Sequence, residues 1–340
     1  MPQTRLPDTF LRLDASSYHR PQFFQDEKNL AQSLGMKYQL IHFSKMDSLK
    51  KQEELQHLTN TAQSFCLVTN THTPIVKLPK DLLEKTHILL HPNSGYDNFP
   101  MDWVQKQKFP IVLGNEIRSQ AVAHYTINEL LQHENRIPSQ KSWDKSRNWD
   151  RTLLDEKEIL LIGMGTIGHL IQQVLTPLTS RLSLFDPFKG HGKFSDFSSL
   201  LKKADIILFA CSLNESSRHL LSEENIDLLK EDILIINGAR GPLINESSLI
   251  DFLADHPKAY AVLDVFEEEP FQNQFEKLNN IKTTSHIAGV SKNLDQRILN
   301  FEEKYLELLL EDRELPKDLL LQNRIISHAT NTNKEKRILL

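Results

Sequence analysis

The stretch Ile159-Leu-Leu-Ile-Gly163-Met-Gly165-Thr-Ile-Gly168 decides the fold class of this 340-residue chain. A short apolar run is followed by three glycines at the spacing G-x-G-x-x-G, and a helical pattern then runs from Thr166 to Leu175. The next apolar run ends at Asp186, 18 residues after Gly168. A strand, a glycine turn, a helix, a second strand and an acid form the pattern with which parallel-sheet domains hold a dinucleotide.

Each residue of this pattern has a chemical task. Gly163 permits a tight turn, Gly165 lets the backbone approach a pyrophosphate at the positive end of the helix, and Gly168 lets the helix pack closely on the strand. Asp186 can accept hydrogen bonds from the ribose hydroxyls and would repel a 2′-phosphate, so the pattern favours NAD over NADP. Lys189 weakens that preference, because its positive charge lies three residues further on. The alternative is a glycine turn in an unrelated α/β protein.

Strand and helix patterns alternate over most of the chain, which predicts parallel sheets covered by helices on both faces. The predicted strands are Phe10–Leu13, Tyr38–Phe43, Phe65–Val68, Ile88–His91, Ile111–Leu113, Ile159–Ile162, Leu182–Phe185, Ile206–Ala210, Ile233–Ile236, Tyr260–Val265 and Ile281–Thr284. The predicted helices are Glu27–Leu34, Asp47–Leu58, Asn115–Glu134, Thr166–Leu175, Phe197–Lys203, Glu223–Leu229, Glu246–Ala254 and Leu294–Leu310. We therefore expect an α/β protein with two doubly wound parallel-sheet domains.

Three chemically active side chains follow three of the predicted strands in the second half of the chain. They are Arg240, Glu269 and His286. In open α/β sheets the ligand crevice lies outside the carboxyl ends of the strands, so we expect these three side chains at one edge. Histidine is suited to exchange a proton with a carbinol oxygen, a carboxylate would orient its ring, and arginine would hold a substrate carboxylate by two hydrogen bonds. Taken singly, each also fits an ordinary structural role.

The segments around these residues resemble the D-isomer-specific 2-hydroxyacid dehydrogenases. Those that carry the resemblance are Gly163-Met-Gly165-Thr-Ile-Gly168, Asp186-Pro187, Asn237-Gly-Ala-Arg240-Gly241, Asp264-Val-Phe-Glu-Glu-Glu269-Pro270 and His286-Ile-Ala-Gly289. In the first half, Asn93-Ser94-Gly95-Tyr96-Asp97-Asn98 resembles the substrate loop of that family, and Ala121-Val-Ala-His124-Tyr125-Thr126 resembles its linking helix. The chain departs from the family pattern in the loop Ala210–Asn214, which lacks the usual proline and threonine, at Ser285 and at His124.

The resemblance implies a role for each matching residue. It implies Arg240 as the substrate clamp, Glu269 as the partner of the histidine and His286 as the catalytic acid and base. The cofactor-binding residues that we predict are Gly163, Gly165, Thr166, Ile167, Gly168, Asp186, Gly238, Ala239, Arg240, Asp264, His286 and Gly289. The predicted substrate-binding residues are Ser94, Gly95, Arg240 and His286.

The resemblance also implies a domain organisation. A Rossmann NAD-binding domain is expected at residues 121–289, and a discontinuous, flavodoxin-like substrate domain at residues 1–120 and 290–325. Residues 326–340 are expected to form a tail. The family relationship further implies a homodimer formed through the cofactor domain.

Composition excludes several other classes of protein. The chain has 40 Lys and Arg against 45 Asp and Glu, a formal net charge of −5, which gives no general attraction to nucleic acid or anionic membranes. Cys66 and Cys211 are too few for a disulfide framework or a zinc cluster, and the first residues lack a secretory signal. His87 and His91 would lie roughly 13 Å apart on a strand, too far for one metal ion. We expect a cytoplasmic protein without a metal, a nucleic-acid partner or a membrane association.

These observations predict an NAD-dependent oxidoreductase that interconverts a small D-2-hydroxy acid and its 2-keto acid by hydride transfer, with histidine acid/base catalysis. The alternative is an NAD(H)-sensing binding protein or corepressor of the same fold, in which turnover is incidental. The substrate side chain stays open among lactate-like, glyoxylate-like, hydroxypyruvate-like and phosphoglycerate-like acids.

Overall fold

The chain divides into two compact units in a computed structural model, which describes residues 6–16, 19–45, 48–135, 137, 139, 141–146 and 152–323. The first unit consists of Met1–Arg118 with Ser291–Leu340, and the second of Ser119–Val290. Each unit has its own parallel sheet, which confirms the predicted class of two doubly wound α/β domains. The predicted tail at residues 326–340 lies outside the described residues.

The sheet of the first unit has five strands in the order β2-β1-β3-β4-β5, and every neighbouring pair is parallel. Its strands are β1 (Thr9–Leu13), β2 (Lys37–Ile41), β3 (Phe65–Val68), β4 (Thr86–His91) and β5 (Ile111–Leu113). This strand order is that of flavodoxin-like sheets.

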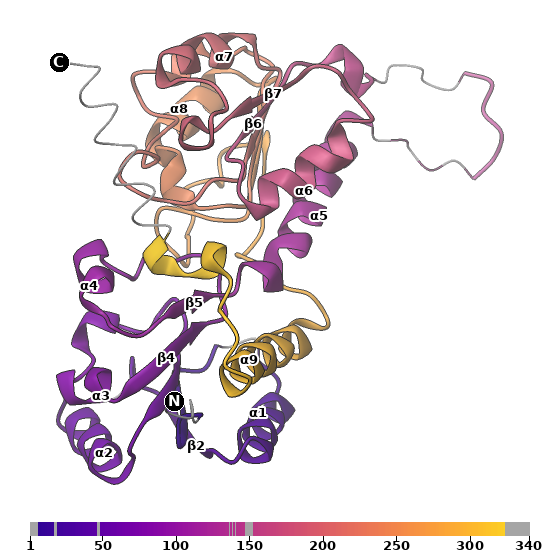
Figure 1. Ribbon diagram of the computed structural model, residues 1–340. Coiled ribbons are helices and arrows are strands. Elements are labelled where there is room, and N and C mark those ends of the chain that lie inside the picture. Colours follow the sequence, from indigo (N-terminus) through magenta and orange to yellow (C-terminus); the bar gives the residue numbers. More distant parts are fainter. Residues whose placement is uncertain are drawn as a thin grey trace. The chain divides into compact units, whose positions relative to one another are not determined.

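Helices cover both faces of this sheet (Figure 1). They are α1 (Pro21–Ser33) and α9 (Leu294–Leu310) on one face, and α2 (Ser48–Thr61), α3 (Lys80–Glu84) and α4 (Met101–Lys106) on the other. Successive strand residues point to opposite faces, so Phe10 and Val68 pack with α1 and α9, whereas Leu11 and Leu67 join the opposite core. The first unit is thus completed by a helix from the far end of the chain.

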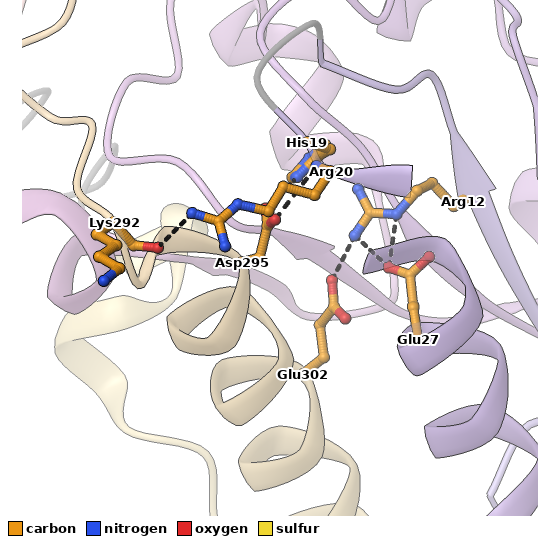
Figure 2. Close-up of polar contacts among 7 residues, drawn as sticks. All are labelled: Arg12, His19, Arg20, Glu27, Lys292, Asp295 and Glu302. Atoms are coloured by element: carbon orange, nitrogen blue, oxygen red, sulfur yellow. Dashed lines mark hydrogen bonds and ion pairs between the residues drawn. The ribbon is translucent and has the colours of Figure 1, made fainter. Parts of the chain in front are cut away.

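A buried polar cluster fixes α9 to the N-terminal part of this unit, as Figure 2 shows. Arg12 of β1 donates from Nε to Glu27 Oε1 of α1 and from Nη2 to Glu302 Oε1 of α9, both over 2.5 Å. His19 Nδ1 lies 2.8 Å from Oδ1 of Asp295, which is in the first turn of α9. The helix is therefore held by directional polar contacts as well as by its apolar face.

The sheet of the second unit has six parallel strands in the order β11-β10-β9-β8-β6-β7. Its strands are β6 (Ile159–Ile162), β7 (Leu182–Phe185), β8 (Ile206–Phe209), β9 (Leu234–Asn237), β10 (Tyr260–Leu263) and β11 (Ile281–Thr283). Since β7 and β8 lie on opposite sides of β6, the direction in which the sheet is built reverses there. The carboxyl end of β6 is therefore where such a sheet binds its ligand.

Helices cover the second sheet on both faces (Figure 1). They are α5 (Asn115–Glu134) and α6 (Thr166–Leu175) on one face, and α7 (Phe197–Lys203) and α8 (Glu246–Asp255) on the other. Ile171 of α6 packs with Ile159 and Leu161 of β6, while Phe252 of α8 shares the opposite core with Leu160. Strands that are buried on both faces explain why their sequences are continuously apolar.

Most predicted elements are confirmed, several of them with the same bounds, including α6, α7 and α9. The predicted helix Glu223–Leu229 is wrong, because only a short 3₁₀ turn forms at Ile226–Leu228. There the Asn225 side chain accepts a hydrogen bond from the Ser222 amide and donates to the Leu220 carbonyl, and such side-chain contacts compete with helical hydrogen bonds. In the described part of the chain, no helix combines the length and the apolar character that crossing a membrane requires.

Candidate active site

The glycine turn after β6 has the shape of a dinucleotide cradle. Gly163 has φ +96°, and a Cβ on Gly168 would lie 2.0 Å from the Gly163 carbonyl oxygen, so neither position accepts a side chain. At Gly165 a Cβ would meet nothing within 4 Å, which leaves open space above the turn. Gly165 is also the N-cap of α6, and no side chain caps the helix. The first amides of α6, which include Thr166 and Ile167, can therefore face an anion.

Asp186 follows β7 directly and is tied to this turn. Its Oδ2 accepts a hydrogen bond of 2.9 Å from the Met164 amide, while Lys189 Nζ donates over 2.8 Å to the Met164 carbonyl. The Asp186 carboxylate thus binds the amide of Met164, and the Lys189 ammonium binds its carbonyl. Among the described groups none donates to Asp186 Oδ1, so one oxygen of the acid is left for the ribose of a dinucleotide. The residues present fit NAD.

Glu269 and His286 form a pair at the carboxyl edge of the same sheet. The His286 Nδ1 and the Glu269 Oε2 lie 2.7 Å apart, and the side chains are 52% and 36% exposed, respectively. Burial alone would raise the pKa of Glu269, but the hydrogen bond and charge of His286, the Phe266 amide and the charge of Arg240 together lower it. Glu269 is therefore ionised at neutral pH, and it holds one ring nitrogen of a half-exposed imidazole.

Arg240 lies on the turn that follows β9. Asn237, the last residue of β9, fixes this turn, since its Oδ1 accepts from the Ala239 amide over 3.0 Å and its Nδ2 donates to the Arg240 carbonyl over 2.8 Å. The Arg240 Nη1 donates to the Ala239 carbonyl over 2.7 Å. Because the charge of Arg240 lowers the pKa of Glu269, the guanidinium, the carboxylate and the imidazole form one local electrostatic group.

Asp264 is predicted as a cofactor contact, and its side chain is fully buried. Its Oδ1 accepts hydrogen bonds from Thr284 Oγ1 over 2.5 Å and from the Ile287 amide over 2.8 Å, and its Oδ2 accepts from the Ala288 amide over 2.8 Å. Both oxygens are thus used by the loop that contains His286. A contact between Asp264 and the cofactor stays a proposal.

The other predicted cofactor positions lie in the second unit as well. Gly238 and Ala239 form the turn after β9, and Gly289 follows the loop that Asp264 holds. A Cβ on Gly238 would lie 3.5 Å from Tyr125 Cδ1 and 3.6 Å from the Ala288 side chain, so three segments meet there. All predicted residues for the cofactor and for catalysis therefore follow the carboxyl ends of strands of one sheet, on turns and loops or, for Thr166, Ile167 and Gly168, in the first turn of α6.

Ser94 and Gly95 belong to the first unit, on the loop after β4. His91, which is fully buried, supports this loop: its Nδ1 lies 2.9 Å from Thr69 Oγ1 and its Nε2 lies 3.0 Å from the Gly95 carbonyl. Within the described residues, the amides of Ser94 and Gly95 have no acceptor. The sequence analysis only excludes His91 from a metal site, and its support of the loop could not be inferred from the spacing.

Sequence reasoning missed three further residues of the site. Asn237 was quoted only as part of a motif, although a polar residue at the end of a buried strand is a usable signal. Thr284 and Tyr125 gave no such signal, because their hydroxyls meet across 159 positions of sequence, at 2.9 Å. In the described part of the chain, no group of three or more His, Cys, Asp or Glu side chains is arranged to hold a metal ion.

The chain is similar in sequence to proteins of a known family. Residues 121–288 match the family described as D-isomer specific 2-hydroxyacid dehydrogenase, NAD binding domain. The chain is 25% identical over 300 residues to a glyoxylate reductase of Thermofilum pendens, which covers 83% of this chain and 87% of the relative. It is 26% identical over 267 residues to a hydroxypyruvate reductase of Blautia hydrogenotrophica, covering 72% and 82% of the two chains.

The solved structures show the same fold. A glyoxylate reductase from Paecilomyes thermophila superposes with a TM-score of 0.72 at 19% identity, over 94% of this chain and 100% of that one. Residues 121–288 are thus an NAD-binding domain of the Rossmann type. Through this domain, the chain is similar to the family of D-isomer-specific 2-hydroxyacid dehydrogenases.

Proposed function

We propose that the protein is an NAD-dependent oxidoreductase that interconverts a small 2-keto acid and the corresponding D-2-hydroxy acid. The observation that carries the proposal is the pair of Glu269 and His286, 2.7 Å apart, with the charge of Arg240 acting on it. The pair lies on the same sheet as the glycine turn, and all of these groups follow carboxyl ends of its strands. An acid/base pair at that edge is suited to move a proton to or from a bound substrate.

NAD, when bound, supplies or accepts the hydride of this reaction. We assign its pyrophosphate to the amides at the start of α6, where Gly165 leaves open space. Its adenosine ribose is assigned to Asp186, whose second oxygen has no donor among the described groups. The glycines at 163 and 168 keep this turn narrow enough for backbone contact.

His286 is the proposed acid and base. Its Nδ1 faces Glu269, so Nε2 is the ring nitrogen left for the substrate oxygen. In the reducing direction His286 donates a proton from Nε2 to the carbonyl oxygen as the carbonyl carbon is reduced, and in the oxidising direction it takes that proton back. The ionised Glu269 pairs with Nδ1 and thereby fixes the ring orientation.

Arg240 is the proposed substrate clamp. A guanidinium can bind the carboxylate of a 2-keto acid with two parallel hydrogen bonds, and it also stabilises negative charge on the neighbouring carbonyl oxygen. We assign the first unit to substrate binding, since the amides of Ser94 and Gly95 have no acceptor within the described residues. The second unit is the cofactor domain. A homodimer and a cytoplasmic location, which the resemblance implies, belong to the same proposal.

The test is a panel of 2-keto acids offered with NADH, followed by the loss of NADH absorbance. The panel holds glyoxylate, pyruvate, hydroxypyruvate and phosphohydroxypyruvate. We expect turnover of at least one of them by the unmodified protein and none by His286→Asn, with NADH binding retained in both. Binding of NADH without oxidation by any of these acids would support an NAD(H)-sensing protein instead.

A further inference from the structure

The backbone of His286 is in an unfavourable conformation. Its φ is +53°, in the left-handed region that residues with a side chain rarely adopt. Such a conformation persists only where the surrounding structure holds it, and it is often found at functional sites. What holds the His286 loop therefore also decides where the imidazole lies relative to Glu269.

Asp264 makes the contacts that hold this loop. The His286 amide donates to the Asp264 carbonyl over 2.8 Å, and the next two amides, of Ile287 and Ala288, donate to its carboxylate over 2.8 Å each. Ile287 is 51% exposed, so the hydrogen bond of its amide to the carboxylate, and not a buried side chain, anchors this residue. Three consecutive residues are thus bound to one buried acid.

The Asp264 carboxylate is in turn oriented by two hydroxyl groups. Thr284 donates its hydroxyl proton to Asp264 Oδ1 over 2.5 Å. The Tyr125 hydroxyl lies 2.9 Å from the Thr284 oxygen, and because the threonine proton is already used, the tyrosine is the donor. Burial raises the pKa of Tyr125 to about 12, so the phenol keeps the proton that it donates.

We infer that Thr284 and Tyr125 are positioning residues for the candidate acid/base. The hydrogen bonds run from Tyr125 to Thr284, from Thr284 to Asp264, and from the loop amides to the same carboxylate. This arrangement fixes the left-handed turn at His286 and thereby holds its Nδ1 against Glu269. The inference rests on the proposed role of His286 and adds to it two residues that touch neither the imidazole nor Glu269 in the contacts described.

The experiment compares Thr284→Val, which removes the hydroxyl but keeps the shape, with Thr284→Ser, which keeps the hydroxyl. Tyr125→Phe removes the outer donor. The matched control is Thr283→Val, since the neighbouring threonine makes no side-chain hydrogen bond among the described residues. The readouts are kcat with the best 2-keto acid, the Kd for NADH, and amide hydrogen exchange at Ile287 and Ala288.

We expect Thr284→Val to lower kcat by roughly 10- to 100-fold, since a displacement of about 1 Å of a reacting group costs up to about 10²-fold. The Kd for NADH should change little, and Thr284→Ser should restore kcat. Hydrogen exchange at Ile287 and Ala288 should become several-fold faster in Thr284→Val and not in Thr283→Val. Tyr125→Phe should change the same readouts in the same direction, by less.

Unchanged exchange and unchanged kcat in Thr284→Val would overturn the inference, as would an equal effect of Thr284→Ser. A loss of folding shared by Thr284→Val and Thr283→Val would also count against a specific role. If the unmodified protein reduces no acid of the panel, the proposed function fails by itself. The exchange measurement still decides in that case whether Thr284 holds the loop, so the two failures can be distinguished.

Discussion

Replacement of Glu302 by glutamine should make the first unit more stable than that of the unmodified protein, and this advantage should grow as the pH rises. Two carboxylates, Glu27 and Glu302, share the single guanidinium of Arg12, and all three side chains are at most 1% exposed (Figure 2). Glu302 Oε2 is buried and has no hydrogen-bond partner in the described residues. A fully ionised cluster would leave one buried negative charge without a partner, so one carboxyl group keeps its proton.

The sign of the pH dependence follows from the pKa of Glu302. Burial and the charge of Glu27 raise this pKa well above its usual value of 4.5, although Arg12 opposes the shift. A raised pKa in the folded state contributes stability below the unfolded pKa, and that contribution is lost as the pH rises through the folded pKa. In this window the free energy of unfolding should fall by roughly 1 kcal/mol per pH unit. Glutamine is neutral at every pH and can still accept from Arg12.

The assay is urea unfolding of the full chain over a pH series, with amide hydrogen exchange in α9 to report on the first unit. The difference between Glu302→Gln and the unmodified protein should grow with pH from about pH 5 and then level off. Taking the difference cancels the contribution of His19, whose pKa burial lowers and which acts in the opposite direction. Glu303→Gln, on the adjacent exposed position, is the control. A difference that does not change with pH would refute the reasoning.

Three further variants test the candidate active site. Arg240→Lys should lower kcat/KM for the keto acid by roughly 10- to 100-fold, since a charge-assisted hydrogen bond is worth about 1.5–3 kcal/mol. The Kd for NADH, measured by fluorescence, should stay the same. Equal losses in both quantities would remove the clamp role. Asp186→Ala should raise the ratio of kcat/KM with NADPH to that with NADH, and a constant ratio would contradict the ribose assignment. Gly168→Ala should abolish NADH binding and lower the unfolding free energy by about 1–3 kcal/mol, because the new Cβ would lie 2.0 Å from the Gly163 carbonyl oxygen. Normal NADH binding by this variant would contradict the close packing.

Local patterns predicted the elements whose sequence and surroundings agree. Strand β6 and helix α6 are flanked by glycines with a clear turn function, and the structure has them at the predicted residues. Parallel strands bring their carboxyl ends to one edge, so the order of the chain was enough to expect Arg240, Glu269 and His286 on one side of a sheet. The 2.7 Å contact between Glu269 and His286 is consistent with that expectation.

Contacts between distant segments could not be predicted in the same way. Arg12 lies on a short apolar strand and Glu302 in the middle of a helix, and only packing shows that they meet inside the first unit. The left-handed turn at His286 has only a weak signal in residue type, since histidine is enriched at positive φ but still adopts it uncommonly. The hydroxyls of Thr284 and Tyr125, like the charges of Arg12 and Glu302, meet only because the fold brings remote segments together.

The most direct test of the central claim follows the hydride itself. NADH deuterated at the transferable position of the nicotinamide is incubated with the protein and the best 2-keto acid other than glyoxylate, whose product has no D and L isomers. The product is separated on a chiral column and analysed by mass spectrometry. We expect a D-2-hydroxy acid that carries deuterium at C2, and no labelled product from His286→Asn. A labelled L isomer, or a full yield of labelled product from His286→Asn, would contradict this expectation.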